Sequence, residues 1–204
     1  PGRGHHQHRR HHRRPGAGLS AAAPPGPPAP SEGPSAVRPA PAVRAVPVPQ
    51  TGAYTLKQGT ARHGKVLALL QQADNAPDRC PNLHQSKQQR DIRVYPLNDR
   101  QALIAAACLE GAYQSTDFNA VLNKNLSRVQ QILPRDYGGF DPKTATLSGS
   151  FKGRGLGDCL HSQSAVWNGL NFSPARKSST GQCKGFPGGA WELPEFVSKN
   201  VGGK

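Results

Sequence analysis

The 204-residue sequence contains no methionine and no apolar run that approaches membrane-spanning length. A helix needs about 20 consecutive apolar residues to cross a bilayer, so the sequence predicts no transmembrane segment. A charged start followed by an apolar stretch, which marks a signal peptide, is also absent. Because the chain begins at Pro1 and lacks methionine, we interpret it as a processed product or a fragment, from which a signal would already have been removed. The missing signal therefore argues little against export.

Acidic residues are scarce, because 12 Asp and Glu stand against 26 Lys and Arg, and the formal net charge is +14. Residues 1–50 hold seven Arg and one Glu, which leaves +8 for the remainder. This first stretch is rich in Pro, Ala and His, and it has too few large apolar side chains to offset the entropy of ordering. We predict a disordered basic tail over residues 1–50 that makes non-specific contacts with polyanions, followed by a single globular domain over residues 51–204.

Aromatic residues make up only 6% of the chain, so the fold class is predicted from the spacing of aliphatic residues. An amphipathic helix is predicted over residues 60–73, where Val66, Leu67, Leu69 and Leu70 form a broad apolar stripe. Apolar runs and alternation predict strands over residues 92–95, 103–109, 118–123, 129–133 and 145–151. Together these elements predict an α+β fold, with a mainly antiparallel sheet and one N-terminal helix.

A stretch from residue 153 to 191 combines two cysteines, two tryptophans and a hairpin signature. Asn168-Gly169 lies between two short apolar runs, and Asn-Gly accepts the positive φ angles of a two-residue turn. Such a turn would pair Trp167 with Leu170, and the sheet needs an apolar face, so we predict that Trp167 is buried. An exposed indole would instead be a platform for stacking on a sugar or an aromatic group.

The four cysteines, Cys80, Cys108, Cys159 and Cys183, admit three disulfide pairings. Zinc is the main alternative, but the closest two cysteines are 24 positions apart and the sequence has no short Cys-x-x-Cys knuckle. We therefore expect disulfides, and we predict no metal site and no cofactor. A disulfide that closes a loop of about 25 residues stabilises a domain by roughly 3 kcal/mol on the chain-entropy model.

The same late stretch and several upstream motifs form a recognisable series. The most specific motif is Gly-Arg-Gly-Leu-Gly-Asp-Cys at residues 153–159, and the others are Asp78-Arg79-Cys80-Pro81, Tyr95-Pro96-Leu97, Cys108 with Gly111-Ala112-Tyr113, the run at residues 141–147, Trp167-Asn168-Gly169, Cys183-Lys184-Gly185 and Trp191. Over residues 61–198 this series resembles the bacterial domain of unknown function 1176 family. Leu109, Gln114 and Leu160 depart from the family pattern, and the separate N-terminal half of many members is absent.

The resemblance implies an exported envelope protein, periplasmic or secreted, and it brings no established activity. Together with the spacing of the cysteines, it favours the pairs Cys80 with Cys108 and Cys159 with Cys183. Disulfides of this kind form and persist in oxidising compartments.

Asp158, His161 and Ser162 are close enough in sequence to suggest a catalytic triad. Triads are assembled in space, however, and this segment lacks the strand-to-helix turn that exposes a nucleophile. We therefore predict no catalytic residues, and we expect Asp158 to accept hydrogen bonds from backbone amides of the glycine-rich loop. The candidate binding or structural residues are Arg154, Asp158, His161, Trp167 and Trp191.

The sequence favours a non-enzymatic binding or structural module of the bacterial envelope, whose partner is an envelope protein or a polysaccharide. One alternative is an envelope hydrolase that uses Asp158 and His161. Another is a polyanion-binding protein that acts through its basic charge. A concave pocket that joins Asp158, His161 and a second polar group would favour the enzyme, whereas a flat aromatic or basic patch would favour binding.

Overall fold

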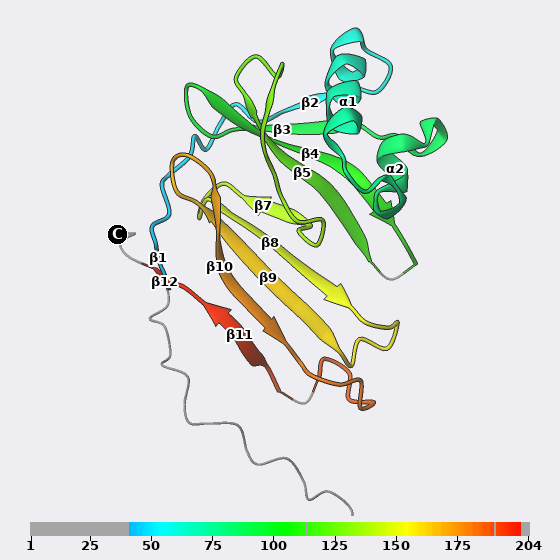
Figure 1. Ribbon diagram of the computed structural model, residues 1–204, viewed down its shortest axis with the longest axis vertical. Coiled ribbons are helices and arrows are strands. Elements are labelled where there is room, and N and C mark those ends of the chain that lie inside the picture. The colour runs from blue at the N-terminus through cyan, green and yellow to red at the C-terminus, as the bar shows by residue number, and fades with distance from the viewer. Residues whose placement is uncertain (1–40, 113, 190, 201–204) are drawn as a thin grey trace, which may run out of the picture. The chain divides into compact units, whose positions relative to one another are not determined.

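The computed structural model describes residues 41–112, 114–189 and 191–200 (Figure 1). Most of the predicted tail, residues 1–40, therefore lies outside the described residues. The described part contains two antiparallel sheets of five strands each and few helices. The prediction of a mainly antiparallel fold is confirmed, but the prediction of one sheet is wrong, because alternation along a strand does not reveal which strands pair.

The first sheet has the strand order β2-β3-β4-β5-β6 and consists of β2 (Tyr54–Leu56), β3 (Ile92–Pro96), β4 (Gln101–Glu110), β5 (Ser115–Asn123) and β6 (Val129–Ile132). The second has the order β11-β10-β9-β8-β7 and consists of β7 (Gly139–Asp141), β8 (Thr146–Lys152), β9 (Leu160–Trp167), β10 (Phe172–Ser179) and β11 (Leu193–Val197). A short parallel pair joins β1 (Ala42–Val43) to β12 (Lys199–Asn200).

Two α-helices lie on the first sheet, α1 (Ala61–Ala73) and the short α2 (Pro81–His84), with single 3-10 turns at η1 (Pro77–Arg79) and η2 (Ser86–Gln88). The Thr60 hydroxyl caps α1 by accepting a hydrogen bond from the His63 N–H at 3.2 Å. The sequence analysis predicted one helix and missed α2, whose first residue, Pro81, suits the first turn of a helix.

The first core lies between the helices and the first sheet. Its buried members come from α1 and α2 and from one face of β3, β4 and β5, and they include Val66, Leu70, Leu83, Ile104 and Phe118. The Cys80–Cys108 disulfide crosses this core and ties the start of α2 to β4. β4 is buried on both faces, because Leu103 belongs to the second core, and this explains its continuous apolar run.

The second core lies where the two sheets meet. Leu103 and Val121 of the first sheet pack here with Leu147, Trp167 and Phe172 of the second. Trp167 is fully buried and its ring centroid lies 5.4 Å from that of Phe172, so the predicted burial of Trp167 agrees with the structure.

The segment before β2 also joins this core. Val48 is buried in it, and the Val46 N–H donates to the Trp167 carbonyl at 2.8 Å. The predicted boundary at residue 50 thus falls inside a segment that packs against the second sheet.

The β9–β10 hairpin exists, but its turn differs from the prediction. Trp167 pairs with Phe172 instead of Leu170, so the loop has four residues. The Asn168 side-chain oxygen accepts hydrogen bonds from the backbone N–H groups of Leu170 at 3.0 Å and Asn171 at 2.9 Å. Gly169 adopts φ +97°, as predicted for a positive-φ position, but the asparagine side chain stabilises the longer turn.

Candidate binding site

Two loops meet at the end of the second sheet that lies opposite the β9–β10 turn (Figure 1). We call them the glycine-rich loop (residues 153–159, between β8 and β9) and the aromatic loop (residues 180–189, 191 and 192, between β10 and β11). The Cys159–Cys183 disulfide joins them, and the Gly188 N–H donates to the Gly157 carbonyl at 2.9 Å. The two predicted disulfide pairs are therefore both present, and this one fixes the aromatic loop on the sheet.

Two positions of the glycine-rich loop require glycine, each for a different structural reason. A side chain at Gly153 would meet the Cys159 sulfur at 2.8 Å, so only glycine fits over the disulfide. Gly157 adopts φ +69°, a left-handed conformation that other residues rarely take.

Asp158 holds the two loops in one arrangement. Its buried carboxylate accepts hydrogen bonds from the Arg154 Nε at 2.7 Å, from the second Arg154 nitrogen, Nη2, and from the Gly185 N–H at 2.6 Å. The Arg154 hydrogen bonds hold the pKa of Asp158 well below its usual range, and the Gly185 N–H adds to this effect against the opposing effect of burial. The amide partner predicted in the glycine-rich loop is instead found in the aromatic loop.

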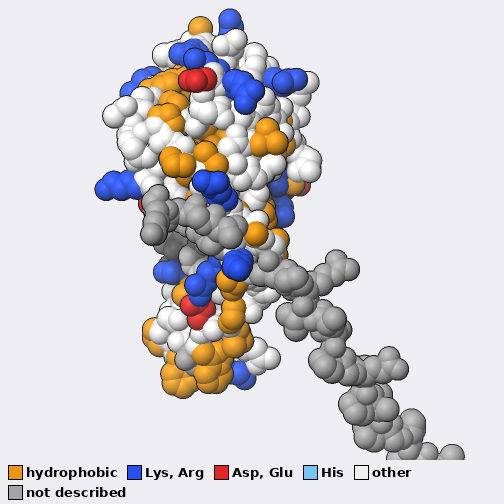
Figure 2. All heavy atoms as spheres, turned by 90° about the vertical axis from the view of Figure 1, so that its left-hand side faces the viewer, with side chains coloured by type: hydrophobic (Ala, Val, Ile, Leu, Met, Phe, Trp, Pro, Cys, Tyr) orange, Lys and Arg blue, Asp and Glu red, His pale blue; other side chains and the backbone are white. Residues whose placement is uncertain are grey.

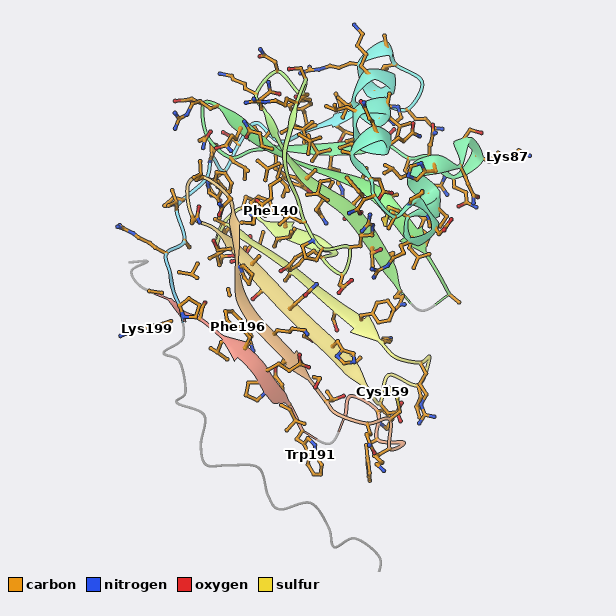
Figure 3. The ribbon with its side chains drawn as sticks, viewed as in Figure 1. Lys87, Phe140, Cys159, Trp191, Phe196 and Lys199 are labelled. Atoms are coloured by element: carbon orange, nitrogen blue, oxygen red, sulfur yellow. A yellow bond between two sulfur atoms is a disulfide. The ribbon has the colours of Figure 1, made fainter. Side chains whose placement is uncertain are left out.

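Exposed apolar side chains gather on the aromatic loop. Trp191 is 66% exposed and Phe186 is 61% exposed, and Leu193, at the start of β11 next to the loop, is 46% exposed. Figure 2 shows hydrophobic side chains collected at this end of the second sheet, and Figure 3 shows Trp191 projecting from it beyond Cys159. These three side chains line a hollow of about 280 Å³, whose polar wall includes Gln182 and Lys184. Exposed aromatic groups around a hollow are typical of an interaction site.

Serine side chains cover the open face of the second sheet next to this hollow. The strand register places Ser150, Ser162 and Ser178 side by side on β8, β9 and β10. A second line follows two residues further along each strand. We call these lines the first serine row (Ser150, Ser162, Ser178) and the second serine row (Ser148, Ser164, Arg176). Side chains alternate along a strand, so both rows face away from the buried side of Ala165 and Trp167.

Three hollows connect the aromatic loop to the serine rows. The hollow at Trp191 is followed by one of about 360 Å³, and the two share Thr180 and Trp191. A third hollow of about 390 Å³ lies over the serine rows and shares Ser162, Ser178 and Glu192 with the second. The shared residues make these three hollows neighbours at this end of the second sheet, and we call them together the sheet groove.

Glu192 forms the boundary between the second and third hollows. The buried Ser178 hydroxyl donates to its carboxylate at 2.7 Å, and an Arg176 nitrogen lies 2.7 Å from the same oxygen. The Ser178 hydrogen bond and the charge of Arg176 lower the pKa of Glu192, so the carboxylate is ionised near neutral pH and its charge is matched by that of Arg176.

The structure separates the residues of the hydrolase hypothesis. Asp158 is buried in its ion pair with Arg154. His161 is exposed on β9, opposite Phe151 and Ser179 in the register, and no hydrogen bond joins it to Asp158 within the described residues. Because the Asp158 carboxylate is paired with Arg154 and is not hydrogen-bonded to His161, the two residues do not have the geometry of a general acid–base pair.

Asp158, Cys159 and Cys183 place possible metal-ligating atoms within 4.8 Å of one another. The two sulfur atoms are bonded to each other, however, and a metal requires thiolates. Arg154 also occupies the carboxylate. The cluster is therefore a structural junction of the two loops.

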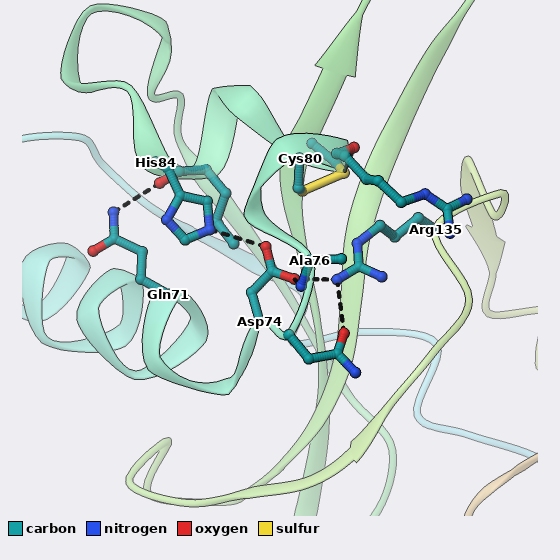
Figure 4. A network of polar contacts seen from close by, with 10 residues as sticks. Gln71, Asp74, Ala76, Cys80, His84 and Arg135 are labelled. Carbon is teal, nitrogen blue, oxygen red and sulfur yellow. Dashed lines mark hydrogen bonds and ion pairs between the residues drawn. A yellow bond between two sulfur atoms is a disulfide. The ribbon is translucent and has the colours of Figure 1, made fainter.

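A second buried carboxylate, Asp74, lies at the end of α1, away from the sheet groove (Figure 4). It accepts hydrogen bonds from the Ala76 N–H at 3.0 Å and from the side chains of His84 and Arg135. Burial raises the pKa of Asp74, but these hydrogen bonds outweigh burial and the net shift is downward. The network links α1, α2 and the segment after β6, and we assign it a structural role.

Three of the candidate residues, Arg154, Asp158 and Trp191, lie at the same end of the second sheet. The sequence analysis missed the serine rows and the exposed Phe186. A signal for the rows was available, because Ser148 and Ser150, and again Ser162 and Ser164, recur at the two-residue period of one strand face.

The fold and the site together define a disulfide-bonded β-sheet protein with an aromatic loop beside a polar groove. The model of the family described as Protein of unknown function (DUF1176) matches residues 16–198, and the chain belongs to this family. The resemblance stated from the motifs is confirmed, and the match begins at residue 16 instead of residue 61. No curated protein and no solved structure matches the chain. Among the described residues, no helix is long and apolar enough to span a bilayer.

Proposed function

We propose that the protein is an exported, non-enzymatic envelope module that binds polysaccharide at the aromatic loop and in the sheet groove. The observation that carries the proposal is the exposed indole of Trp191 beside a groove lined with serine hydroxyl groups. Sugars present apolar C–H faces and a rim of hydroxyl groups. An aromatic ring supplies apolar area for the faces, and serine hydroxyl groups both donate and accept hydrogen bonds with the rim.

The composition of the groove favours a polysaccharide over a protein partner. Protein–protein interfaces are enriched in aromatic residues and depleted in serine relative to the rest of a protein surface. The floor of the sheet groove is made mainly of serine, and its exposed aromatic groups are confined to one end. A protein partner that covered the groove would have to supply a hydrogen-bond partner for each of these serine hydroxyl groups.

The two disulfides support the exported location. Disulfides persist in secreted and periplasmic proteins, whereas cytosolic thiols are kept reduced. Alkylation of the protein recovered from cells, denatured without reductant, should label no cysteine. Four labelled cysteines would overturn the proposed location.

Co-sedimentation with insoluble chitin, cellulose and peptidoglycan tests the proposed ligand. The full chain should be retained by at least one of these polymers, and the variant Trp191→Ala with Phe186→Ala should be lost from it. Tyr54→Ala, which removes a 38% exposed aromatic side chain from the first sheet, is the matched control and should be retained.

Two results would contradict the proposal. One is a wild-type chain that binds none of the three polymers but captures an envelope protein through Trp191, which would identify a protein partner. The other is retention that disappears near 1 M salt, where charges are screened beyond about 3 Å, because this would indicate the polyanion-binding alternative.

A further inference from the structure

The sheet groove is elongated along the strands. From Trp191 it passes the level of Leu160 and Thr180, then the first serine row, and ends at the second serine row. Successive rows are two residues apart on each strand, which corresponds to about 7 Å. The groove therefore continues well past the surface that the aromatic loop alone provides, and its length suits a chain of several sugar units.

The second and third hollows of the sheet groove carry no net charge. Arg176 and Glu192 are the charged residues that line these two hollows in the described part, and they form an ion pair with each other. The serine hydroxyl groups are neutral. A ligand with repeated negative charges would therefore find no uncompensated cation over the two serine rows, although Lys184 lines the first hollow and the chain as a whole is basic.

The floor of the groove is also flat and low. Side chains no larger than serine occupy five of the six positions in the two rows, and adjacent strands are about 4.8 Å apart. Ser178 is buried against Glu192, and the accessible hydroxyl groups of Ser148, Ser150, Ser162 and Ser164 form a small grid of donors and acceptors. Such a grid suits the repeating hydroxyl or acetamido groups of a regular polymer.

We infer that the ligand is a linear, neutral polysaccharide whose chain stacks on Trp191 at one end and extends across both serine rows to Ser148. The inference rests on the proposed polysaccharide binding and adds the class of polymer and its path. The aromatic loop supplies affinity for a short piece of the chain, and the serine rows supply the additional affinity for a longer one.

Titration calorimetry with oligosaccharides of two lengths tests the path. The probes are disaccharides and hexasaccharides of the chitin and cellulose series, with polygalacturonate as the anionic counterpart. The wild-type chain should bind one hexasaccharide at least tenfold more tightly than its disaccharide. In the variant Ser148→Val with Ser150→Val this difference should vanish, while the disaccharide affinity is kept. Both serines are exposed, so valine suits these strand positions.

Thr55→Val on the first sheet is the matched control, because it removes an exposed strand hydroxyl outside the groove and should keep the length dependence. Should the double variant melt at a lower temperature, Ser150→Val alone carries the test. Equal affinity for both lengths in the wild type, lost on Trp191→Ala, would overturn the extended path and leave polysaccharide binding standing. Tighter, salt-sensitive binding of polygalacturonate would overturn neutrality, and absence of all binding would overturn the proposed function itself.

Discussion

A tryptophan, a disulfide and a buried aspartate occur both around the two cores and at the far end of the second sheet, but in different surroundings. We call the first sheet, its helices and the adjoining half of the second sheet the covered region, and the remaining half of the second sheet with its two loops the open end. The covered region has a fully buried tryptophan, Trp167, whereas the open end has one that is 66% exposed, Trp191. Each region also has one disulfide and one buried aspartate bonded to an arginine.

These matched residues contribute to stability in the covered region and hold an exposed surface in place at the open end. In the covered region the tryptophan, the disulfide and the aspartate lie among residues that bury apolar area, which is the main favourable contribution to folding. At the open end the corresponding groups hold two loops in place around a surface that faces solvent. Substitution of matched pairs should therefore give large losses of stability in one region and losses of binding in the other.

The largest difference is expected between the two tryptophans. Trp167→Ala should lower the free energy of unfolding by about 3–5 kcal/mol, because it leaves a cavity in the second core. Trp191→Ala should change it by no more than about 0.5 kcal/mol, as is usual for surface substitutions, while abolishing retention by the polysaccharide. Urea unfolding followed by circular dichroism measures both. Equal losses would show that the aromatic loop is part of the core.

The two disulfides form the next pair. Their sequence separations are 28 and 24, so the chain-entropy model assigns about 3.5 kcal/mol to each. Cys80 and Cys108 are both fully buried, whereas Cys183 is exposed. Replacement of Cys80 and Cys108 by Ala should therefore cost more than replacement of Cys159 and Cys183, and only the second change should weaken polysaccharide binding. The reverse order of melting temperatures would contradict the division into regions.

The two aspartates should also differ. Asp74→Asn should lower stability by about 3 kcal/mol, because it leaves the mostly buried Arg135 without its carboxylate. Asp158→Asn should have a smaller effect, because Arg154 is half exposed and regains water. Thermal unfolding of both variants measures the difference, and a larger loss for Asp158→Asn would contradict it.

The pH dependence of stability gives a second test of the role of Asp74. The pKa of Asp74 is lowered in the folded state from its ordinary value of 3.8, so the unfolded chain takes up the proton first as pH falls. The stabilising contribution is complete above about pH 4 and is lost as pH falls through the folded-state pKa. Asp74→Asn should therefore lose less stability than the wild type between about pH 4 and pH 2. Parallel acid profiles would show that Asp74 titrates alike in both states.

The smallest of these effects is expected where the two regions adjoin. A side chain at Gly149 on β8 would lie 1.8 Å from the backbone oxygen of Asp136, so the two segments touch backbone to backbone. Gly149→Ala should cost about 1–3 kcal/mol through displacement of this segment. Gly139→Ala on β7, where nothing lies within 4 Å, is the control. An unchanged melting temperature for Gly149→Ala would mean that this contact is loose.

Much of the covered region could be predicted from the sequence. The apolar run of β4 and the alternation of β5 predicted strands, because burial there depends on the strand's own residues. The second sheet could not be separated from the first, since a strand's pattern defines its two faces but not its neighbours. β11 was missed because its residues are largely exposed and include Pro194, which is tolerated at a sheet edge.

The open end was predicted only in part. The cysteines and glycines of the two loops carried a signal, but the exposure of Trp191 did not. An indole next to glycine and proline residues has the same sequence environment whether it is covered or not. The four-residue turn after Trp167 was mispredicted because the side chain of Asn168 competes with the backbone for hydrogen bonds.

The parallel pairing of β1 with β12 brings the first and the last described strands together, with Ala42 opposite Lys199. The aromatic loop lies at the opposite end of β11, and the five residues of this strand span about 17 Å. The described part of the chain therefore begins and ends at one end of β11, and the aromatic loop lies at the other end. Neighbouring chain ends are what allow a domain to be inserted into another protein or circularly permuted. A short linker between residues 41 and 200, with new termini between the exposed residues Lys124 and Asn125, should give a permuted chain that keeps the aromatic loop intact.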